Sequence, residues 1–373
     1  MSRRPIRLQF YGYFSAWNSM SNICRQYAKE LSQSVSDIGL EDASRFDASW
    51  HAYAGYEGAR QISEGSGIMD KALKPFEGCD PNAPVGFFYG TPEEAWPKLK
   101  GHAYKVGGFV CETDRIPHRW VEVCNRLDQI YVPSHFCAQA FQLSGVRTPI
   151  KIVRHGLEDE FTPNADKILS EPFIFFNTFS VYSFPERKGC EELIRCFLKA
   201  FPGHNDVVLR LRTHSFGPIA EYRRKYHFGD QVQIIPYHFG TLEDVAQMLR
   251  AVHCTVHPSK GEGFGLIPFQ SIACETPVIA PCATGMAEYI SMKTAMPLRI
   301  GRRIRGPSWD NQPGCYYAVD EDHLIHLLRH ARENWSFEYQ KVRIAGEEFR
   351  CKYRWSNVLR PVMQDMLDVI QRY

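Results

Sequence analysis

Patterns typical of β-strands and α-helices alternate along almost the whole chain, and this alternation constrains the fold more than any other feature. Short apolar runs such as Pro84–Tyr89 and Val207–Thr213 are typical of buried strands. His135–Ser144 and Leu242–Arg250 have the spacing of amphipathic helices. Strands that alternate with helices favour parallel sheets covered by helices. The chain is therefore predicted to be an α/β protein.

The alternation is interrupted at residues 157–172, an acidic stretch with two prolines and no periodicity, which we interpret as a linker. A chain of 373 residues is long enough for two domains. We predict a Rossmann-like domain over 1–160, a second over 161–345, and a helical segment over 346–373. Doubly wound sheets bind ligands at the carboxyl ends of their strands, so we expect a site in a cleft between the two domains. Residues 292–314 show no regular pattern and are expected to be irregular.

The overall charge excludes a protein that binds nucleic acid through its net charge. The 44 Lys and Arg residues against 42 Asp and Glu give a net charge of +2. Basic residues nevertheless gather at Arg299, Arg302, Arg303 and Arg305, and again at 223–225. Three interpretations stay open for these clusters: solvated surface, contact with nucleic-acid phosphates, or contact with anionic lipid head groups.

The twelve cysteines are scattered and form no CxxC pair, which argues against a zinc site. We interpret them as reduced side chains of a cytoplasmic protein. No stretch of the sequence approaches the roughly 18 apolar residues that a membrane-spanning helix requires. We therefore predict a cytoplasmic location.

The segment from His257 to Gln270 has the composition of a ligand-binding loop. A strand pattern ends at His257, glycines follow at positions 261, 263 and 265, and a helix is expected from about Ile267. Glycines allow the backbone to approach a ligand, and the N–H groups of a helix N-terminus favour an anion such as a diphosphate. Glu262 is suited to accept hydrogen bonds from sugar hydroxyls. The spacing fits neither GxGxxG nor a P-loop, which disfavours nicotinamide and P-loop nucleotide sites.

Three motifs in this region resemble the family 4 glycosyltransferases of GT-B fold: Pro258-Ser259, the EGFGL run Glu262–Leu266, and the TPVI run Thr276–Ile279. Segments 131–134 and 186–189 extend the resemblance over most of the chain. The resemblance implies two Rossmann-like domains that face a central cleft, and a C-terminal helix that crosses back to the first domain. It also implies that a hexose is transferred with retention from a nucleotide-diphosphate sugar, such as UDP-glucose, to an acceptor hydroxyl.

The same resemblance assigns roles to individual residues. Arg187 and Lys188 would contact the donor diphosphate, and Glu262 would face the donor sugar. Positive charge just before a helix opposes the helix dipole, which independently suggests an anionic ligand there. The family's second glutamate falls at Gln270, so the mode of nucleotide binding is open. The donor-binding candidates are Gly12, Gly261, Gly263, Phe264, Gly265, Leu266, Gln270, Pro236, Tyr237, Gly285 and Met286.

The acceptor-side candidates are weaker. Glu112, at a predicted strand end, is suited to orient an acceptor hydroxyl and is included among the catalytic candidates. His102 and His118 are candidates for the same task, although a structural role is favoured over a catalytic one for both. Trp17 belongs to the loop after the first strand, which we expect to face the cleft.

Several properties of the reaction stay open at this stage. The donor is expected to be a UDP-sugar, or a GDP- or ADP-sugar, and the acceptor a glycan, a lipid-linked glycan or a DNA base. A DNA-base glycosyltransferase, a nucleotide-sugar epimerase and a non-catalytic binder are the alternatives. Asp320-Glu321-Asp322 resembles a metal motif, but helix capping explains it better, so no essential metal or cofactor is expected. The sequence does not indicate the oligomeric state.

Overall fold

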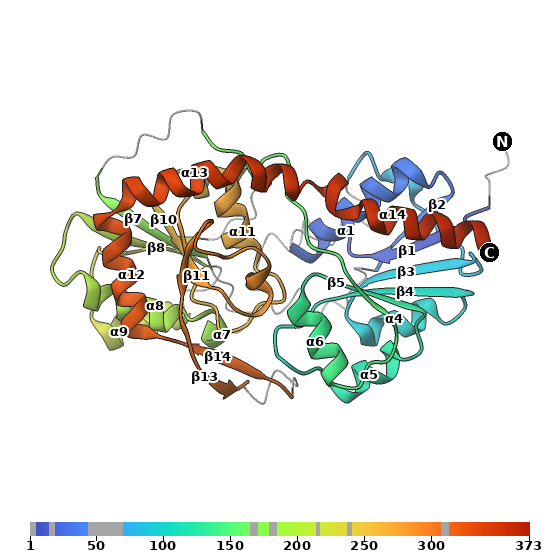
Figure 1. The fold of residues 1–373 in the computed structure, drawn as a ribbon, viewed down its shortest axis with the longest axis horizontal. Helices are drawn as coiled ribbons and strands as arrows, with labels where there is room; N and C mark the ends of the chain where they lie inside the picture. The colour runs from blue at the N-terminus through green and yellow to red at the C-terminus, as the bar shows by residue number, and fades with distance from the viewer. Residues whose placement is uncertain are drawn as a thin grey trace. The chain divides into compact units, whose positions relative to one another are not determined.

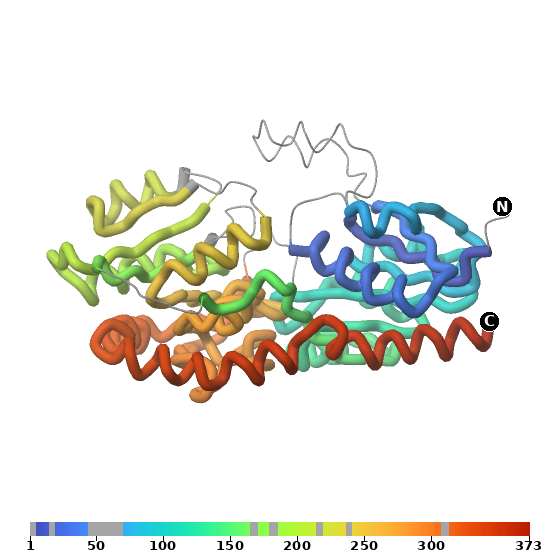
Figure 2. The backbone as a smooth tube through the Cα atoms, turned by 90° about the horizontal axis from the view of Figure 1, so that it is seen from above, coloured from blue at the N-terminus to red at the C-terminus, as the bar shows by residue number. Residues whose placement is uncertain are grey.

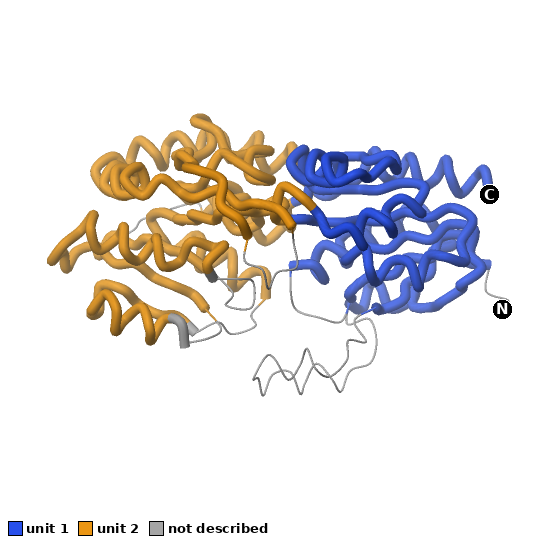
Figure 3. The backbone as a smooth tube through the Cα atoms, turned by 90° about the horizontal axis from the view of Figure 1, so that it is seen from below, with its two compact units in different colours: residues 1–111, 116–156, 355–373 blue, residues 112–115, 157–354 orange. Residues whose placement is uncertain are grey.

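The fold was analysed in a computed structural model, which describes residues 5–14, 19–43, 70–164, 171–178, 185–213, 217–236, 241–306 and 313–373. The chain divides into two compact units, which Figure 3 shows in two colours. The first unit comprises residues 1–111, 116–156 and 355–373, and the second comprises 112–115 and 157–354.

The first unit is built on a six-stranded parallel sheet with the strand order β2-β1-β3-β4-β5-β6. Its strands are β1 (Leu8–Gly12), β2 (Ile38–Asp42), β3 (Val85–Gly90), β4 (Tyr104–Phe109), β5 (Gln129–Val132) and β6 (Ile150–Ile152). Its helices are α1 (Ser19–Ser34), η1 (Lys74–Phe76), α4 (Pro92–Leu99), α5 (His118–Cys124), α6 (His135–Leu143) and α14 (Trp355–Arg372). Helices cover both faces of this sheet, as a buried parallel sheet requires (Figure 1).

The C-terminal helix α14 belongs to the first unit, where it packs beside α1 (Figures 1 and 2). Its buried residues recur every three or four positions and form one apolar stripe: Trp355, Leu359, Val362, Met366 and Ile370. Polar contacts add to this packing, because the Arg7 guanidinium donates to the Ile370 carbonyl over 2.6 Å.

The second unit contains another six-stranded parallel sheet, with the order β12-β11-β10-β7-β8-β9. Its strands are β7 (Phe173–Thr178), β8 (Val207–Thr213), β9 (Val232–Pro236), β10 (Cys254–Val256), β11 (Val278–Pro281) and β12 (Met296–Leu298). An antiparallel hairpin of β13 (Ile300–Arg305) and β14 (Cys315–Val319) follows. The helices are α7 (Pro185–Lys188), α8 (Cys190–Ala200), α9 (Gly217–Tyr226), α10 (Leu242–Arg250), α11 (Leu266–Ala273), η3 (Thr284–Glu288), α12 (Glu321–Glu333) and α13 (Trp335–Lys352).

The α/β architecture with two Rossmann-like sheets confirms the predicted fold class, and β8 and α10 have the predicted bounds. The sequence patterns did not indicate β2, α4 or α9. The expectation that 292–314 is irregular is wrong, because this stretch contains β12 and β13. The sequence did not indicate β13, because this strand is largely exposed and rich in arginine and therefore lacks the apolar alternation of a half-buried strand.

The described part of the predicted linker 157–172 packs on the second unit instead of spanning free solvent. Phe161 is buried there, and the Arg250 guanidinium donates to the carbonyls of Glu160 and Thr162 over 3.0 and 3.1 Å. None of the helices within the described ranges has the length and apolarity needed to cross a membrane.

Gly189 lies between α7 and α8, and its substitution tests how closely the backbone packs there. It has a left-handed backbone with φ of 67°, and a Cβ atom there would lie 2.3 Å from the Pro258 carbonyl oxygen. Gly203 has a similar φ of 73° but no atom within 4 Å of a Cβ position. Gly189→Ala should therefore destabilise the protein more than Gly203→Ala, by about 1–3 kcal/mol in denaturant unfolding. Equal losses in the two variants would contradict this packing.

Candidate functional site

The order of strands in the second unit locates its ligand-binding edge. From β7 the chain proceeds through β8 and β9 on one side, and through β10, β11 and β12 on the other. The direction therefore reverses between β7 and β10, and ligands of doubly wound sheets bind at the carboxyl ends of the strands at such a point. In the chain, α7 is the next described element after β7, and the loop 258–265 follows β10.

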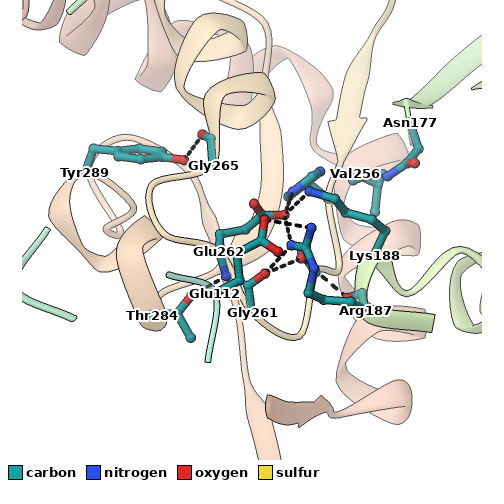
Figure 4. Close-up of polar contacts among 12 residues, drawn as sticks. Glu112, Asn177, Arg187, Lys188, Val256, Gly261, Glu262, Gly265, Thr284 and Tyr289 are labelled. Carbon is teal, nitrogen blue, oxygen red and sulfur yellow. Dashed lines mark hydrogen bonds and ion pairs between the residues drawn. The ribbon is translucent and has the colours of Figure 1, made fainter. Parts of the chain in front are cut away.

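Four charged side chains converge at this point, as Figure 4 shows. The Lys188 ammonium lies 2.6 Å from Glu262 Oε1, and Arg187 Nη1 lies 3.3 Å from the same oxygen. Arg187 Nη2 lies 2.8 Å from Glu112 Oε1, and its Nη1 donates to the Gly261 carbonyl over 2.5 Å. The Arg187 side chain is 1% exposed, whereas that of Lys188 is 16% exposed. Lys188 is therefore the cation that solvent or a ligand can reach more readily.

Residues 112–115 pack with the second unit, where the Glu112 carboxylate contacts Arg187. The Cys315 N–H donates to Asp114 Oδ1 over 2.8 Å, and Asp114 also pairs with Arg303. At Gly261 a Cβ atom would lie 2.3 Å from the Glu112 carbonyl oxygen, so this close approach requires glycine. The hairpin β13–β14 thus helps to hold Glu112 beside Arg187.

Backbone hydrogen bonds hold the loop 258–265 against its neighbours. The Lys260 N–H donates to the Arg187 carbonyl over 2.8 Å, which ties the loop to α7. The Gly285 N–H donates to the Glu262 carbonyl over 2.8 Å, and the Glu262 N–H donates to Thr284 Oγ1 over 3.3 Å. A Cβ atom at Gly285 would lie 2.0 Å from the Gly263 carbonyl oxygen, so η3 and the loop are in direct backbone contact.

The cluster keeps Glu262 ionised although the residue is buried. Burial raises the pKa of its carboxyl, but the nearby charges of Lys188 and Arg187 and the hydrogen bond with His257 outweigh this and hold the pKa well below its ordinary value. His257 Nε2 lies 3.1 Å from Glu262 Oε1, and burial lowers the pKa of the imidazole despite this carboxylate. The cluster therefore contains two cations, two carboxylates and an imidazole that burial favours in its neutral form.

Two donor-binding candidates in and beside the loop have buried side chains. Phe264 is 2% exposed and packs on Phe269 and Tyr289, and Met286 is fully buried. Only their backbone atoms are therefore suited to meet a ligand. Gly265, with φ of 84°, is the N-cap of α11, and Leu266 is half-buried at the first position of that helix.

Gln270, at the position of the family's second glutamate, lies in the middle of α11. Its side chain is 6% exposed and forms no hydrogen bond within the described part of the chain. An amide at this position offers both donors and an acceptor, which leaves it able to bind a polar ligand group.

The other candidates lie in the first unit, at the end of β9 or outside the residues that the structure describes. Gly12 ends β1 of the first unit, where its carbonyl accepts from the Ala43 N–H over 2.7 Å. Pro236 ends β9, and the positions of Tyr237 and Trp17 are outside the residues that the structure describes.

The two histidines proposed for the acceptor side have structural partners. His102 is 2% exposed, with its ring nitrogens 2.6 Å from the Ala83 carbonyl oxygen and 2.9 Å from Tyr11 Oη. It precedes β4 and therefore lies at the amino edge of the sheet, away from the strand ends where ligands bind. His118 is exposed and pairs with Glu122 within α5.

Three polar residues that contact the loop or strands of the site were not among the sequence-based candidates: His257, Asn177 and Thr284. Asn177, near the end of β7, is 1% exposed, and its side-chain amide donates to the Val256 carbonyl over 2.5 Å. A polar residue at the end of an otherwise apolar strand was the available signal for Asn177 and for His257. Thr284 gave no such signal, because only the folded chain brings it to Glu262.

Part of the chain is similar in sequence to known glycosyltransferases. Residues 187–362, just under half of the chain, match a family model described as "Family 4 Glycosyltransferase in conflict systems". An uncharacterized glycosyltransferase of Methanocaldococcus jannaschii is 23% identical over 176 residues, which are 47% of this chain and 40% of that protein. D-inositol 3-phosphate glycosyltransferase of Nocardiopsis dassonvillei is 29% identical over 153 residues, which are 41% of this chain and 30% of that protein. The chain thus aligns with less than half the length of these two relatives.

Solved structures show the same fold over nearly the whole chain. Sucrose-phosphate synthase from Thermosynechococcus elongatus superposes with a TM-score of 0.69 at 14% identity and covers 100% of both chains. HepE from Anabaena, solved in complex with UDP and glucose, has a TM-score of 0.67 at 13% identity and covers 97% of this chain and 99% of its own. The chain has the GT-B fold, and its second unit resembles the family 4 glycosyltransferases.

Arg187 should contribute strongly to stability. Arg187→Ala leaves two carboxylates without this cation, and loss of one partner of a buried ion pair costs about 3–5 kcal/mol. We expect a loss of this size in the free energy of unfolding, measured by urea titration. The control is Arg224→Ala, which replaces an exposed arginine on α9. A loss at Arg187 no larger than in the control would contradict the assignment.

The ionisation of Glu262 should appear in the pH dependence of stability. Because its folded-state pKa is held below the ordinary value of 4.5, the charge stabilises the native state above about pH 4.5. This stabilisation is lost as the pH falls further, through the folded-state pKa. The stability advantage of the native protein over Glu262→Gln should be constant from pH 7 to 5 and shrink below pH 4.5, as measured by chemical denaturation at each pH. An advantage that grows on acidification would contradict this sign.

Proposed function

We propose that the chain is a glycosyltransferase that binds a nucleotide-diphosphate sugar on its second unit and transfers the hexose, with retention, to an acceptor hydroxyl. The donor is a UDP-sugar such as UDP-glucose, or a GDP- or ADP-sugar. The observation that carries the proposal is the pairing of Lys188 with Glu262 where the sheet reverses its strand order. One group supplies positive charge for a diphosphate, and the other accepts hydrogen bonds from sugar hydroxyls.

The two cations of the cluster have different roles in this proposal. Arg187, with 1% of its side chain exposed, holds Glu112, Glu262 and Gly261 in place. Lys188, which is more exposed, exchanges Glu262 for the donor diphosphate when the donor binds. Glu262 is then free to accept hydrogen bonds from the sugar. Glu112 acts as a positioning residue, because its carboxylate pairs with Arg187.

The reaction needs no nucleophile from the protein. The bond between the anomeric carbon and the diphosphate oxygen breaks, and the acceptor oxygen bonds to the same face of that carbon. The acceptor proton passes to the departing diphosphate. Negative charge grows on the diphosphate as the bond breaks, and a preorganised ammonium in a partly dry site stabilises that charge. That the reaction requires no metal or other cofactor stays a prediction.

Lys188→Ala should lower turnover by about a hundredfold or more, which is the effect of removing one preorganised charge donor. The assay follows nucleotide release from UDP-, GDP- and ADP-sugars, with and without glycan, lipid-linked glycan and oligonucleotide acceptors. Arg224→Ala, on the surface of the same unit, is the matched control and should keep native turnover.

Three outcomes would count against the proposal. Near-native turnover of Lys188→Ala would remove the role assigned to this ammonium. Conversion of the nucleotide sugar without any acceptor would indicate an epimerase. Nucleotide-sugar binding with no turnover under any of these conditions would indicate a non-catalytic binder.

A further inference from the structure

The hairpin β13–β14 carries an unusual concentration of positive charge. Residues 296–306 contain four arginines and no acidic residue. Five of the six residues of β13 are exposed. Like charges on neighbouring positions of a strand repel each other, so this arrangement costs stability unless an anion compensates it.

Only part of this charge is balanced within the described chain. Arg303 pairs with Asp114, and Arg299 Nε lies 3.2 Å from Asp320 Oδ2. Arg302 and Arg305 are exposed, and neither side chain forms an ion pair or a hydrogen bond with any described residue. Two guanidinium groups on one short strand therefore have no anionic partner among the residues that the structure describes.

The hairpin lies directly beside the charged cluster of the second unit. The Tyr317 N–H donates to the Lys260 carbonyl over 3.0 Å. The ring of Tyr316 lies 2.7 Å from the position of a Cβ atom at Gly261. Arg115, in the segment that pairs with the hairpin through Asp114, adds another guanidinium nearby. A ligand on the hairpin is thus held next to the loop that carries Glu262.

Arginines lie close together on this strand. Positions 303 and 305 share one face about 7 Å apart, and Arg302 lies where the ladder shifts register between Ile300 and Arg303. An arginine fork binds phosphate oxygens in a bidentate manner. Tyr317 lies opposite Arg303 in the ladder and is only partly buried, so an aromatic ring accompanies the charges. Arginines interleaved with aromatic rings are the chemistry that binds phosphate backbones and stacked bases.

We propose that the β13–β14 hairpin binds the backbone of a nucleic acid strand through Arg302 and Arg305. This surface is separate from the groups that hold the donor in the proposed function, and the binding does not depend on sugar transfer. A net charge of only +2 makes the binding local: it follows from this hairpin and not from a general attraction of the whole protein to polyanions.

The test measures fluorescence anisotropy of labelled single-stranded DNA, duplex DNA and single-stranded RNA of about 20 nucleotides, without any sugar donor, on the full chain. Arg302→Glu/Arg305→Glu should weaken binding of at least one of these probes by about tenfold or more. Arg302→Ala/Arg305→Ala should reduce the salt dependence of log K by about 1–2, because two phosphate contacts are lost.

The matched control is Arg147→Glu/Arg343→Glu, which changes the net charge equally at two exposed arginines outside the hairpin. It should bind like the native protein. Thermal unfolding followed by circular dichroism checks that each variant folds, and the alanine pair replaces the glutamate pair if the latter does not.

Three results would overturn the proposal. The first is that the native protein binds none of the probes at physiological salt. The second is that nucleic-acid binding by the control variant weakens as much as binding by the hairpin variant. In the third, the hairpin variant binds the nucleic acids normally but loses binding to phosphatidylserine-containing vesicles, which would make the hairpin a lipid-binding surface.

Discussion

The geometry of the candidate site depends on the burial of one guanidinium group. Arg187 is 1% exposed, and a buried charge is tolerated only when ion pairs and hydrogen bonds compensate it. Its partners come from segments 112–115 and 258–265, far from each other in sequence. Because each partner would be costly to lose, Arg187 fixes the relative positions of the loop after β10, the helix α7 and the segment that carries Glu112.

The basic pair before α8, Arg187 and Lys188, is balanced by carboxylates of the folded chain. Cations at a helix N-terminus oppose its dipole, and the sequence alone therefore suggested an anionic ligand. The folded chain supplies two anions of its own, Glu262 and Glu112, so the positive charge is largely balanced before any ligand binds. A diphosphate would have to compete with Glu262 for Lys188, and the proposed exchange of partners frees the glutamate at the moment when sugar hydroxyls arrive.

Charge is unevenly distributed between two regions of the second unit. The net charge of +2 suggests a neutral protein, yet β13 and its neighbours carry unbalanced arginines while the cluster around Glu262 is nearly neutral. Asp114 connects the two regions, because it lies in the segment 112–115 with Glu112, pairs with Arg303 and accepts a hydrogen bond from the Cys315 N–H. The basic hairpin is thus structurally coupled to the candidate site.

The sequence by itself determined the alternation of strands and helices, the fold class, and the candidates Arg187, Lys188 and Glu262, because periodicity and short motifs are local properties. It did not reveal β13, whose exposed arginines lack the alternation of a half-buried strand, nor the weaker patterns of β2 and α9. For His102 it left a functional and a structural role open and favoured the structural one, and the fold buries this residue at the amino edge of a sheet. Only the tertiary structure decided the strand order and the partners of Arg187, because pairings between distant segments depend on the register and packing of the whole sheet.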